Sequence, residues 1–146
     1  MKSFAKRIKK IDLAKIVTSK ISKVGIFGDA TYEDGTPVST VAIINEFGSP
    51  SAGIPERSFI RSTVREKGSE WASLAKDELK DVLKLKKTIS KSMSILSNKA
   101  LEDVKQKIIT LDSPENADST VKKKGFNNPL VDTGKMLESI TVRNVK

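Results

Sequence analysis

Two neighbouring stretches of the chain decide the fold: VAIINEFG at residues 41–48 and IPERSFIR at residues 54–61. Glycine and proline shape the loop between them, because a proline holds the residue before it in an extended conformation. From about Ser58 onward, apolar residues recur at helical spacing and predict a long helix. Its predicted buried side carries Val64, Trp71, Leu74, Ala75, Leu79 and Val82.

The first stretch is bounded by residues that commonly begin and end a short helix. Thr36 and Pro37 look like an N-cap followed by a proline in the first turn, and Gly48 looks like a C-terminal cap. We therefore predict a helix of about three turns that ends near Phe47. Its apolar side chains at Val41, Ile44 and Phe47 lie three positions apart, which predicts that they form its buried face.

The chain on either side of these stretches predicts further elements. Residues 24–28 read as a short strand flanked by glycines. A lysine-rich stretch at residues 84–87 predicts a break between two long helices, and the second helix should run from about Leu85 to Leu111. The polar residues 112–128 show no periodicity and predict an exposed loop.

A third stretch, NPLVDTGKMLESI, occupies residues 128–140, about eighty residues after the first. Asp132 is a candidate N-cap for a short helix that holds Met136, Leu137 and Ile140. We expect Gly134 to allow close packing, and we expect residues 141–143 to pair as a strand beside residues 24–27. Taken together, these elements predict a single α+β domain at residues 24–146, with a small sheet and two long helices, preceded by a basic helix or arm at residues 1–23.

Composition narrows the possible chemistry. The chain contains neither histidine nor cysteine. This excludes catalytic triads that depend on either residue, and it excludes disulfides and thiol chemistry. No glycine-rich phosphate loop or calcium-loop spacing is present. We therefore predict a protein that is not an enzyme and has no cofactor and no metal site. No apolar run is long enough for a membrane span, and no signal peptide follows the basic N-terminus.

The net charge is +9, and it is unevenly distributed. Residues 1–23 carry eight Lys and Arg side chains against a single acid, whereas residues 24–75 carry more acids than bases. A basic arm favours polyanions or acidic proteins, although a solvated helix face explains it equally well. The candidates for non-specific contact with DNA or an acidic partner are Lys6, Arg7, Lys9 and Lys10.

The three stretches together resemble the virion-morphogenesis family of tailed bacteriophages, whose members are neck, tail-completion and minor tail proteins. In that family a VA…NEFG helix, an IP.R.F.R segment and a C-terminal PL.DTG.L..SI segment occur in this order. The resemblance covers most of residues 24–142. Three ordered motifs are more specific than any one of them alone.

The resemblance implies a structural role at the head–tail connection or the tail end. Family members typically assemble as rings, often sixfold, around the channel for DNA. The expected partners are therefore other copies of the chain, other neck and tail proteins, and, non-specifically, packaged DNA. The expected location is the virion, reached from the host cytoplasm during assembly. A non-specific DNA-binding accessory protein that uses the basic arm is the alternative.

The motif residues are the candidates for contact between copies. Arg57, Arg61 and Arg65 lie four apart and would form one stripe on a continuous helix. For the first two we favour contacts to Glu46 or Asp132, either between subunits or within the chain, over solvation or phosphate binding. The full set of interface candidates is Asn45, Glu46, Phe47, Arg57, Phe59, Arg61, Asp132, Thr133 and Leu137.

The tripeptide Asp132-Thr133-Gly134 also has an enzymatic interpretation. Asp-Thr-Gly after apolar residues is the signature of retroviral-type aspartic proteases, in which two such carboxylates share a proton. That fold is nearly all strand, whereas the residues after this tripeptide have helical spacing and long helices are predicted earlier in the chain. We therefore favour a structural role for Asp132.

Overall fold

The structure is a computed structural model, and it describes residues 21–145. The predicted α+β class is confirmed, with one two-stranded antiparallel sheet among the described residues. The predicted helix or arm near the N-terminus, with Lys6, Arg7, Lys9 and Lys10, lies outside the described residues. The elements in chain order are β1 (Ile21–Ile26), α3 (Val38–Phe47), the 3-10 turn η1 (Pro50–Ala52), α4 (Ile60–Leu83), α5 (Ile89–Thr110), α6 (Asp118–Lys124), α7 (Lys135–Ser139) and β2 (Ile140–Val145).

The sheet joins the two ends of the described chain. β1 and β2 pair antiparallel, with Ile21 opposite Val145 and Ile26 opposite Ile140. The predicted pairing of residues 24–27 with residues 141–143 is confirmed, but β1 begins three residues earlier and so includes the end of the predicted basic arm. This pairing holds the third motif, which leads into β2, close to the start of the domain.

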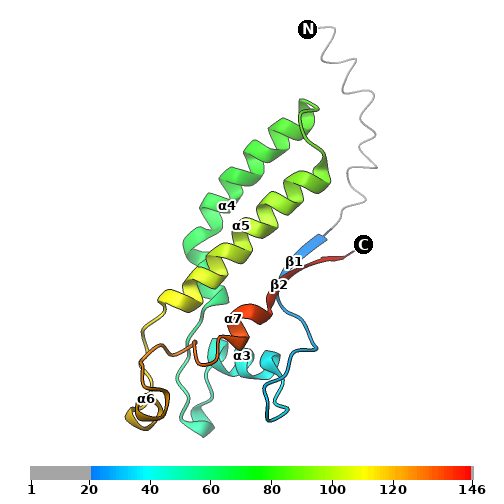
Figure 1. Cartoon of the computed structure of the whole chain (residues 1–146). Helices are drawn as coiled ribbons and strands as arrows, with labels where there is room; N and C mark the ends of the chain where they lie inside the picture. The colour runs from blue at the N-terminus through cyan, green and yellow to red at the C-terminus, as the bar shows by residue number, and fades with distance from the viewer. Residues whose placement is uncertain (1–20, 146) are drawn as a thin grey trace, which may run out of the picture.

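Helices α4 and α5 form a long antiparallel hairpin, and the sheet lies against α5 (Figure 1). The predicted break at residues 84–87 is confirmed. Polar pairs join the two helices along their length: Trp71 Nε1 donates to Asp103 Oδ2 at 2.7 Å, and Lys107 Nζ lies 2.8 Å from Glu66 Oε1. The predicted buried side of α4 is wrong at Val64 and Leu79, which are both about half exposed.

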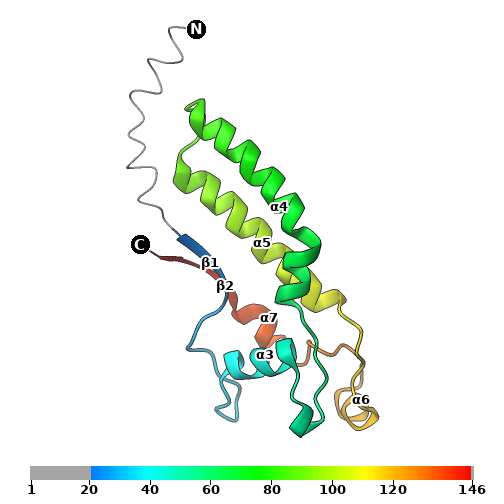
Figure 2. The same ribbon diagram turned by 180° about the vertical axis from the view of Figure 1, so that it is seen from behind.

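One hydrophobic core lies where the lower half of α5 meets α3, α7 and the sheet (Figure 2). All three motif segments contribute to it, and the fully buried Phe59 and Ile140 come from the second and third. This shared core brings stretches eighty residues apart in the sequence into one place. Its buried members are Val38, Ala42, Phe59, Val104, Ile108, Leu130, Met136 and Ile140.

Helix α3 ends as predicted but buries a different face. Gly48 caps it at φ 72° and ψ 172°, while the N-cap is Pro37 rather than Thr36. The buried residues are Val38, Ala42 and Glu46, four apart, whereas Phe47 is 58% exposed. The predicted apolar face is therefore wrong at Phe47, because a carboxylate occupies the buried position next to it.

Three further expectations are wrong near the C-terminus. The predicted loop at residues 112–128 contains the short helix α6, in which Asp118 in the first turn and three lysines in the last complement the helix dipole. Asp132 is not an N-cap. Gly134 takes that position at φ 78°, and Thr133 Oγ1 accepts from the Lys135 N–H at 3.3 Å. A Cβ on Gly134 would meet no atom within 4 Å, so the glycine supplies backbone conformation and not close packing.

Candidate functional site: the junction of the three motif segments

The centre of the site is the carboxylate of Glu46, buried at the end of α3 and aimed at the start of α4. The backbone N–H groups of Phe59, Ile60 and Arg61 donate to it at 2.8, 2.8 and 2.9 Å. Ser58 Oγ donates at 2.9 Å and Arg61 Nε at 3.0 Å. Both carboxylate oxygens are therefore occupied by hydrogen bonds from the second motif.

This arrangement solves a local problem of α4. The first N–H groups of a helix have no partner within the helix, and the residue at the N-cap of α4, Phe59, has no side-chain oxygen to offer. Glu46 supplies the missing acceptor from another element, and its negative charge lies at the positive end of the helix dipole. The first motif thereby fixes where the second motif begins its helix.

The protonation of Glu46 reflects the same contacts. Burial alone would raise the pKa of this carboxyl group, but the hydrogen bonds from Arg61, Ile60 and Ser58 outweigh it and hold the pKa below its ordinary value. Glu46 is therefore ionised at neutral pH, and its charge is used to hold the chain together.

Arg61 completes this arrangement on the solvent side. Its Nη2 donates to the Glu46 carbonyl at 2.6 Å and to Glu56 Oε1 at 2.9 Å. Its guanidinium lies 4.4 Å from the centre of the Phe47 ring, within the range of a cation–π contact. The predicted contact of Arg61 with Glu46 is confirmed, and it is made within one chain.

Arg57 has a different role from the one predicted. It precedes α4, so it does not form a helical stripe with Arg61 and Arg65. Its side chain is buried and donates from Nε to the Pro114 carbonyl at 2.8 Å and from Nη2 to the Glu115 carbonyl at 2.7 Å. Burial lowers the pKa of Arg57. This arginine ties the second motif to the segment that follows α5.

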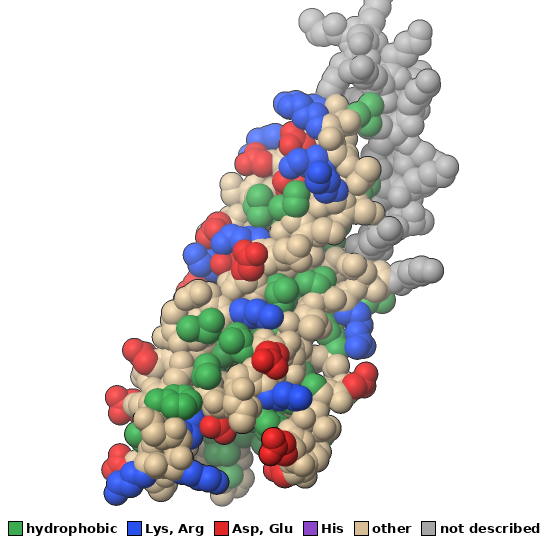
Figure 3. Space-filling model, viewed as in Figure 1, with side chains coloured by type: hydrophobic (Ala, Val, Ile, Leu, Met, Phe, Trp, Pro, Cys, Tyr) green, Lys and Arg blue, Asp and Glu red, His purple; other side chains and the backbone are tan. Residues whose placement is uncertain are grey.

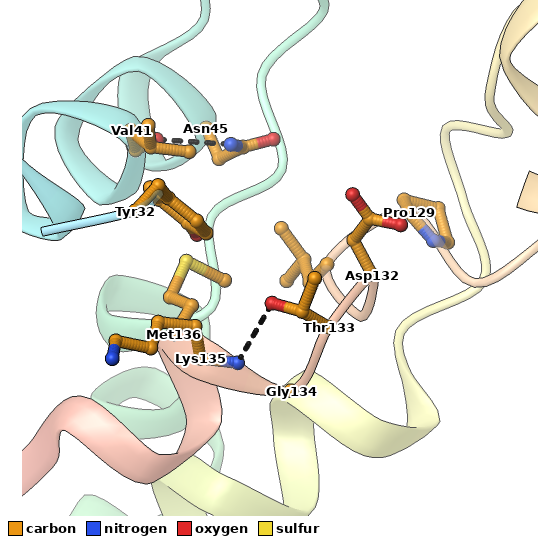
Figure 4. Close-up of a pocket in the computed structure, with 10 residues that line it drawn as sticks. Tyr32, Val41, Asn45, Pro129, Asp132, Thr133, Gly134, Lys135 and Met136 are labelled. Carbon is orange, nitrogen blue, oxygen red and sulfur yellow. Dashed lines mark hydrogen bonds between the residues drawn. The ribbon is translucent and has the colours of Figure 1, made fainter. Parts of the chain in front are cut away.

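A small open pocket of about 160 Å³ lies where the first and third motifs face each other (Figure 4). Asn45 of α3 and Asp132 of the loop before α7 line it, and Tyr32 and Met136 line it on the side away from Asp132. Asn45 Nδ2 donates to the Val41 carbonyl at 2.9 Å. Burial and the charge of Asp132 raise the pKa of Tyr32.

The loop of the third motif is shaped by two residues for which the sequence predicted no role. Asn128 Oδ1 accepts from the Leu130 and Val131 N–H groups at 3.2 and 3.0 Å, a turn that asparagine before proline is well suited to make. Lys124 Nζ donates to the carbonyls of Asn128 and Val131. The asparagine could have been recognised from its spacing, whereas nothing in the sequence indicates the lysine contact.

The interface candidates fall into two groups. Glu46, Arg57 and Phe59 are buried, and Leu137 is half-buried against the core, so these four hold the chain's own segments together. Asn45 is half-buried, and Phe47, Arg61, Asp132 and Thr133 are exposed. The four exposed side chains offer the most surface to another molecule.

Within residues 21–145, no group of acidic side chains is placed to hold a metal ion, and no helix has the length and apolarity to cross a membrane. Asp132 lies in an exposed loop beside helices, and this arrangement differs from the nearly all-strand fold in which the Asp-Thr-Gly signature of proteases operates.

Comparison of the chain with protein-family models, with curated proteins and with solved structures finds no match. The resemblance to the virion-morphogenesis family therefore stays a prediction that depends on the order and spacing of the three motifs.

Proposed function

We propose that this chain is a structural component of a tailed-bacteriophage virion, located at the head–tail connection or the tail end, where identical copies form a ring. The proposal covers neck, tail-terminator and tail-completion roles alike. Sixfold symmetry follows from the family resemblance.

The observation that carries the proposal is how the charged motif residues are used. Glu46 receives five hydrogen bonds from residues 58–61, and Arg57 holds two carbonyls of residues 114 and 115. A carboxylate that acts as a catalytic base needs a free oxygen within reach of a substrate proton. Glu46 has no such oxygen, so these motifs serve architecture.

The contacts of Glu46 and Arg57 also hold in place exposed side chains that come from separate motifs. Phe47 and Arg61 lie on one side of α3, and Asp132 and Thr133 on the other. A scaffold that fixes such residues in place suits repeated contact with identical neighbours, because little order has to be gained on assembly.

Deletion of the gene from its phage tests the proposal. We expect filled heads and tails to accumulate unjoined, or tails with aberrant ends, and wild-type protein supplied in trans to restore infectious particles. The variant Asp132→Arg should fold normally but fail to complement, whereas Glu102→Arg on the exposed face of α5 should complement.

Full infectivity without the gene would contradict the proposal. Normally joined particles that lack infectivity, together with salt-sensitive duplex binding that is lost on replacing Lys6, Lys9 and Lys10 by alanine, would favour the DNA-binding alternative.

A further inference from the structure

Two segments at opposite ends of the molecule carry opposite charge. The last five residues of α4 and the turn that leads to α5, together residues 79–88, contain four lysines and one acid, and we call this segment the hairpin tip. At the opposite end, residues 27–56 contain five acids and no base, and we call this segment the acidic end. Both ribbon views place the hairpin tip and α3 at opposite extremes of the described residues, and basic side chains gather at the top of the surface view (Figure 3).

The hairpin tip also exposes apolar side chains that contact no core. Leu79, Leu83 and Leu85 are all exposed, and Leu85 is exposed by 61%. Among the described residues, Leu85 is the only one other than glycine with a positive φ, at 59°. A left-handed conformation is costly for a leucine and is usually maintained where the surrounding structure has a use for it.

Ion pairs hold the tip in this shape. Lys87 Nζ lies 2.6 Å from Glu78 Oε1 and 3.3 Å from Asp81 Oδ2, and the backbone N–H groups of Leu85 and Lys86 donate to carbonyls of α4 at 2.9 Å. Lysines 80, 84 and 86 are exposed, and Lys80 Nζ lies 2.8 Å from Asp77 Oδ1. The tip is therefore a fixed apolar knob surrounded by positive charge.

The acidic end offers a matching recess. An open apolar groove of about 240 Å³ lies between α3 and the start of α4, and Ile26, Ile43, Phe47 and Ile60 contribute to its walls. An internal cavity of roughly 150 Å³ already admits a benzene ring, so the groove has room for a leucine side chain. Ile43 is 60% exposed at its edge, and Glu56, which pairs with Arg61 in its wall, is exposed beside it.

We propose that the hairpin tip of one copy docks, with Leu85 leading, into the α3–α4 groove of the next copy. Lysines 80, 84 and 86 would then approach Glu56, which is exposed beside the groove, whereas Glu33 and Asp34 line a pocket together with Asp132. The contact joins two different patches, one from each copy, so it is heterologous. Such a contact generates a ring when the rotation that relates successive copies closes on itself. The inference rests on the proposed function in one respect, namely that copies of this chain assemble with one another.

The absence of cysteine from the chain allows a direct test by disulfide formation between copies. Two full-length single-cysteine variants, Leu85→Cys and Ile43→Cys, are mixed under mild oxidation, one of them carrying a tag that changes its size. We expect the mixed dimer to dominate over both like-with-like dimers. The matched control pairs Leu85→Cys with Ser119→Cys, which is exposed on α6, and should give only background cross-linking.

Charge reversal and loss of the knob provide a second readout. Leu85→Asp should weaken self-association, measured by sedimentation velocity over a concentration series, at least about tenfold. Lys84→Glu with Lys86→Glu should weaken it as well, and Lys122→Glu with Lys123→Glu on α6 should leave it unchanged. Mixed cross-linking no greater than in the Ser119 control would overturn the proposed interface.

The two proposals fail separately. If the chain is required for joined particles but the 43–85 cross-link does not form, the function stands and this interface is wrong. Cross-linking of Leu85→Cys mainly to itself would likewise overturn the head-to-tail contact in favour of a symmetric one.

Discussion

At the residue scale, one buried carboxylate connects two motifs. Glu46 caps α4 from the end of α3, and it receives three backbone and two side-chain hydrogen bonds. Isolated helix caps contribute about 1 kcal/mol, and hydrogen bonds to charged groups contribute about 1.5–3 kcal/mol each. Glu46 is therefore expected to be among the side chains on which stability depends most.

Replacement of Glu46 tests this directly. We expect Glu46→Ala to lower the free energy of unfolding by about 3 kcal/mol, because the N–H groups at the start of α4 lose their acceptor. Glu46→Gln keeps one acceptor oxygen and should cost about half as much. Urea denaturation measures both, and Glu102→Ala, exposed on α5, is the control expected to change stability by less than about 0.5 kcal/mol. A cost for Glu46→Ala as small as the control would contradict the capping role.

The pH dependence of stability follows from the same residue. Because contacts in the folded state lower the pKa of Glu46, its contribution is fully present above the pKa of an unfolded glutamate, about 4.3, and is lost as the pH falls through the lower folded value. The stability difference between wild type and Glu46→Gln should therefore be largest near neutrality and shrink below about pH 4.3. Denaturation curves between pH 3 and pH 7 measure this stability difference. A difference independent of pH would argue against an ionised Glu46 carboxylate that holds the start of α4.

At the element scale, glycine is required at the C-terminal end of α3 and unfavourable in the interior of α4. Gly48 has φ 72° and ψ 172°, a region that glycine alone occupies readily, and a Cβ there would lie 2.8 Å from the Glu56 backbone nitrogen. Gly68 lies in the middle of α4 with open space around its Cα. The first glycine is required by the turn between the motifs, and the second only weakens a helix.

This contrast gives a paired prediction. Gly48→Ala should destabilise the protein by about 3 kcal/mol through backbone strain and the close contact. Gly68→Ala should stabilise it by up to about 1 kcal/mol, because alanine loses less conformational entropy in a helix. Thermal unfolding of the two variants beside wild type is the measurement, and shifts of the same sign would contradict the assignment of these two positions.

Much of the element order could be predicted from local signals. The glycine cap of α3, the lysine-rich break between α4 and α5 and the strand pairing all follow from caps, breaks and β-forming residues. The burial of Glu46 in place of Phe47 could not be predicted, because it depends on the N-terminus of a helix fourteen residues further along. Helix α6 was not predicted because only one of its seven residues, Val121, is apolar, so the segment shows no apolar period.

At the scale of the whole molecule, the contacts among the motif segments and the separation of charge along the molecule are related. The motif segments fix the acidic end around a single core, while the long hairpin carries its basic tip away from it (Figure 1). A rigid rod with complementary ends is suited to join copies in sequence, and its attraction between copies should weaken with added salt. The surface for contact between copies could not be predicted from the motifs, because several motif residues are buried in contacts within the chain.

The central claim is that this chain is a ring-forming structural protein at the junction of head and tail, or at the end of the tail. Electron cryomicroscopy of particles purified from the virus that encodes it tests this claim most directly. We predict a collar of density at one of those positions into which residues 21–145 fit as repeated copies, with the tip at residues 79–88 touching α3 of the neighbour. Complete particles whose junction and tail end contain no density for this fold would contradict it.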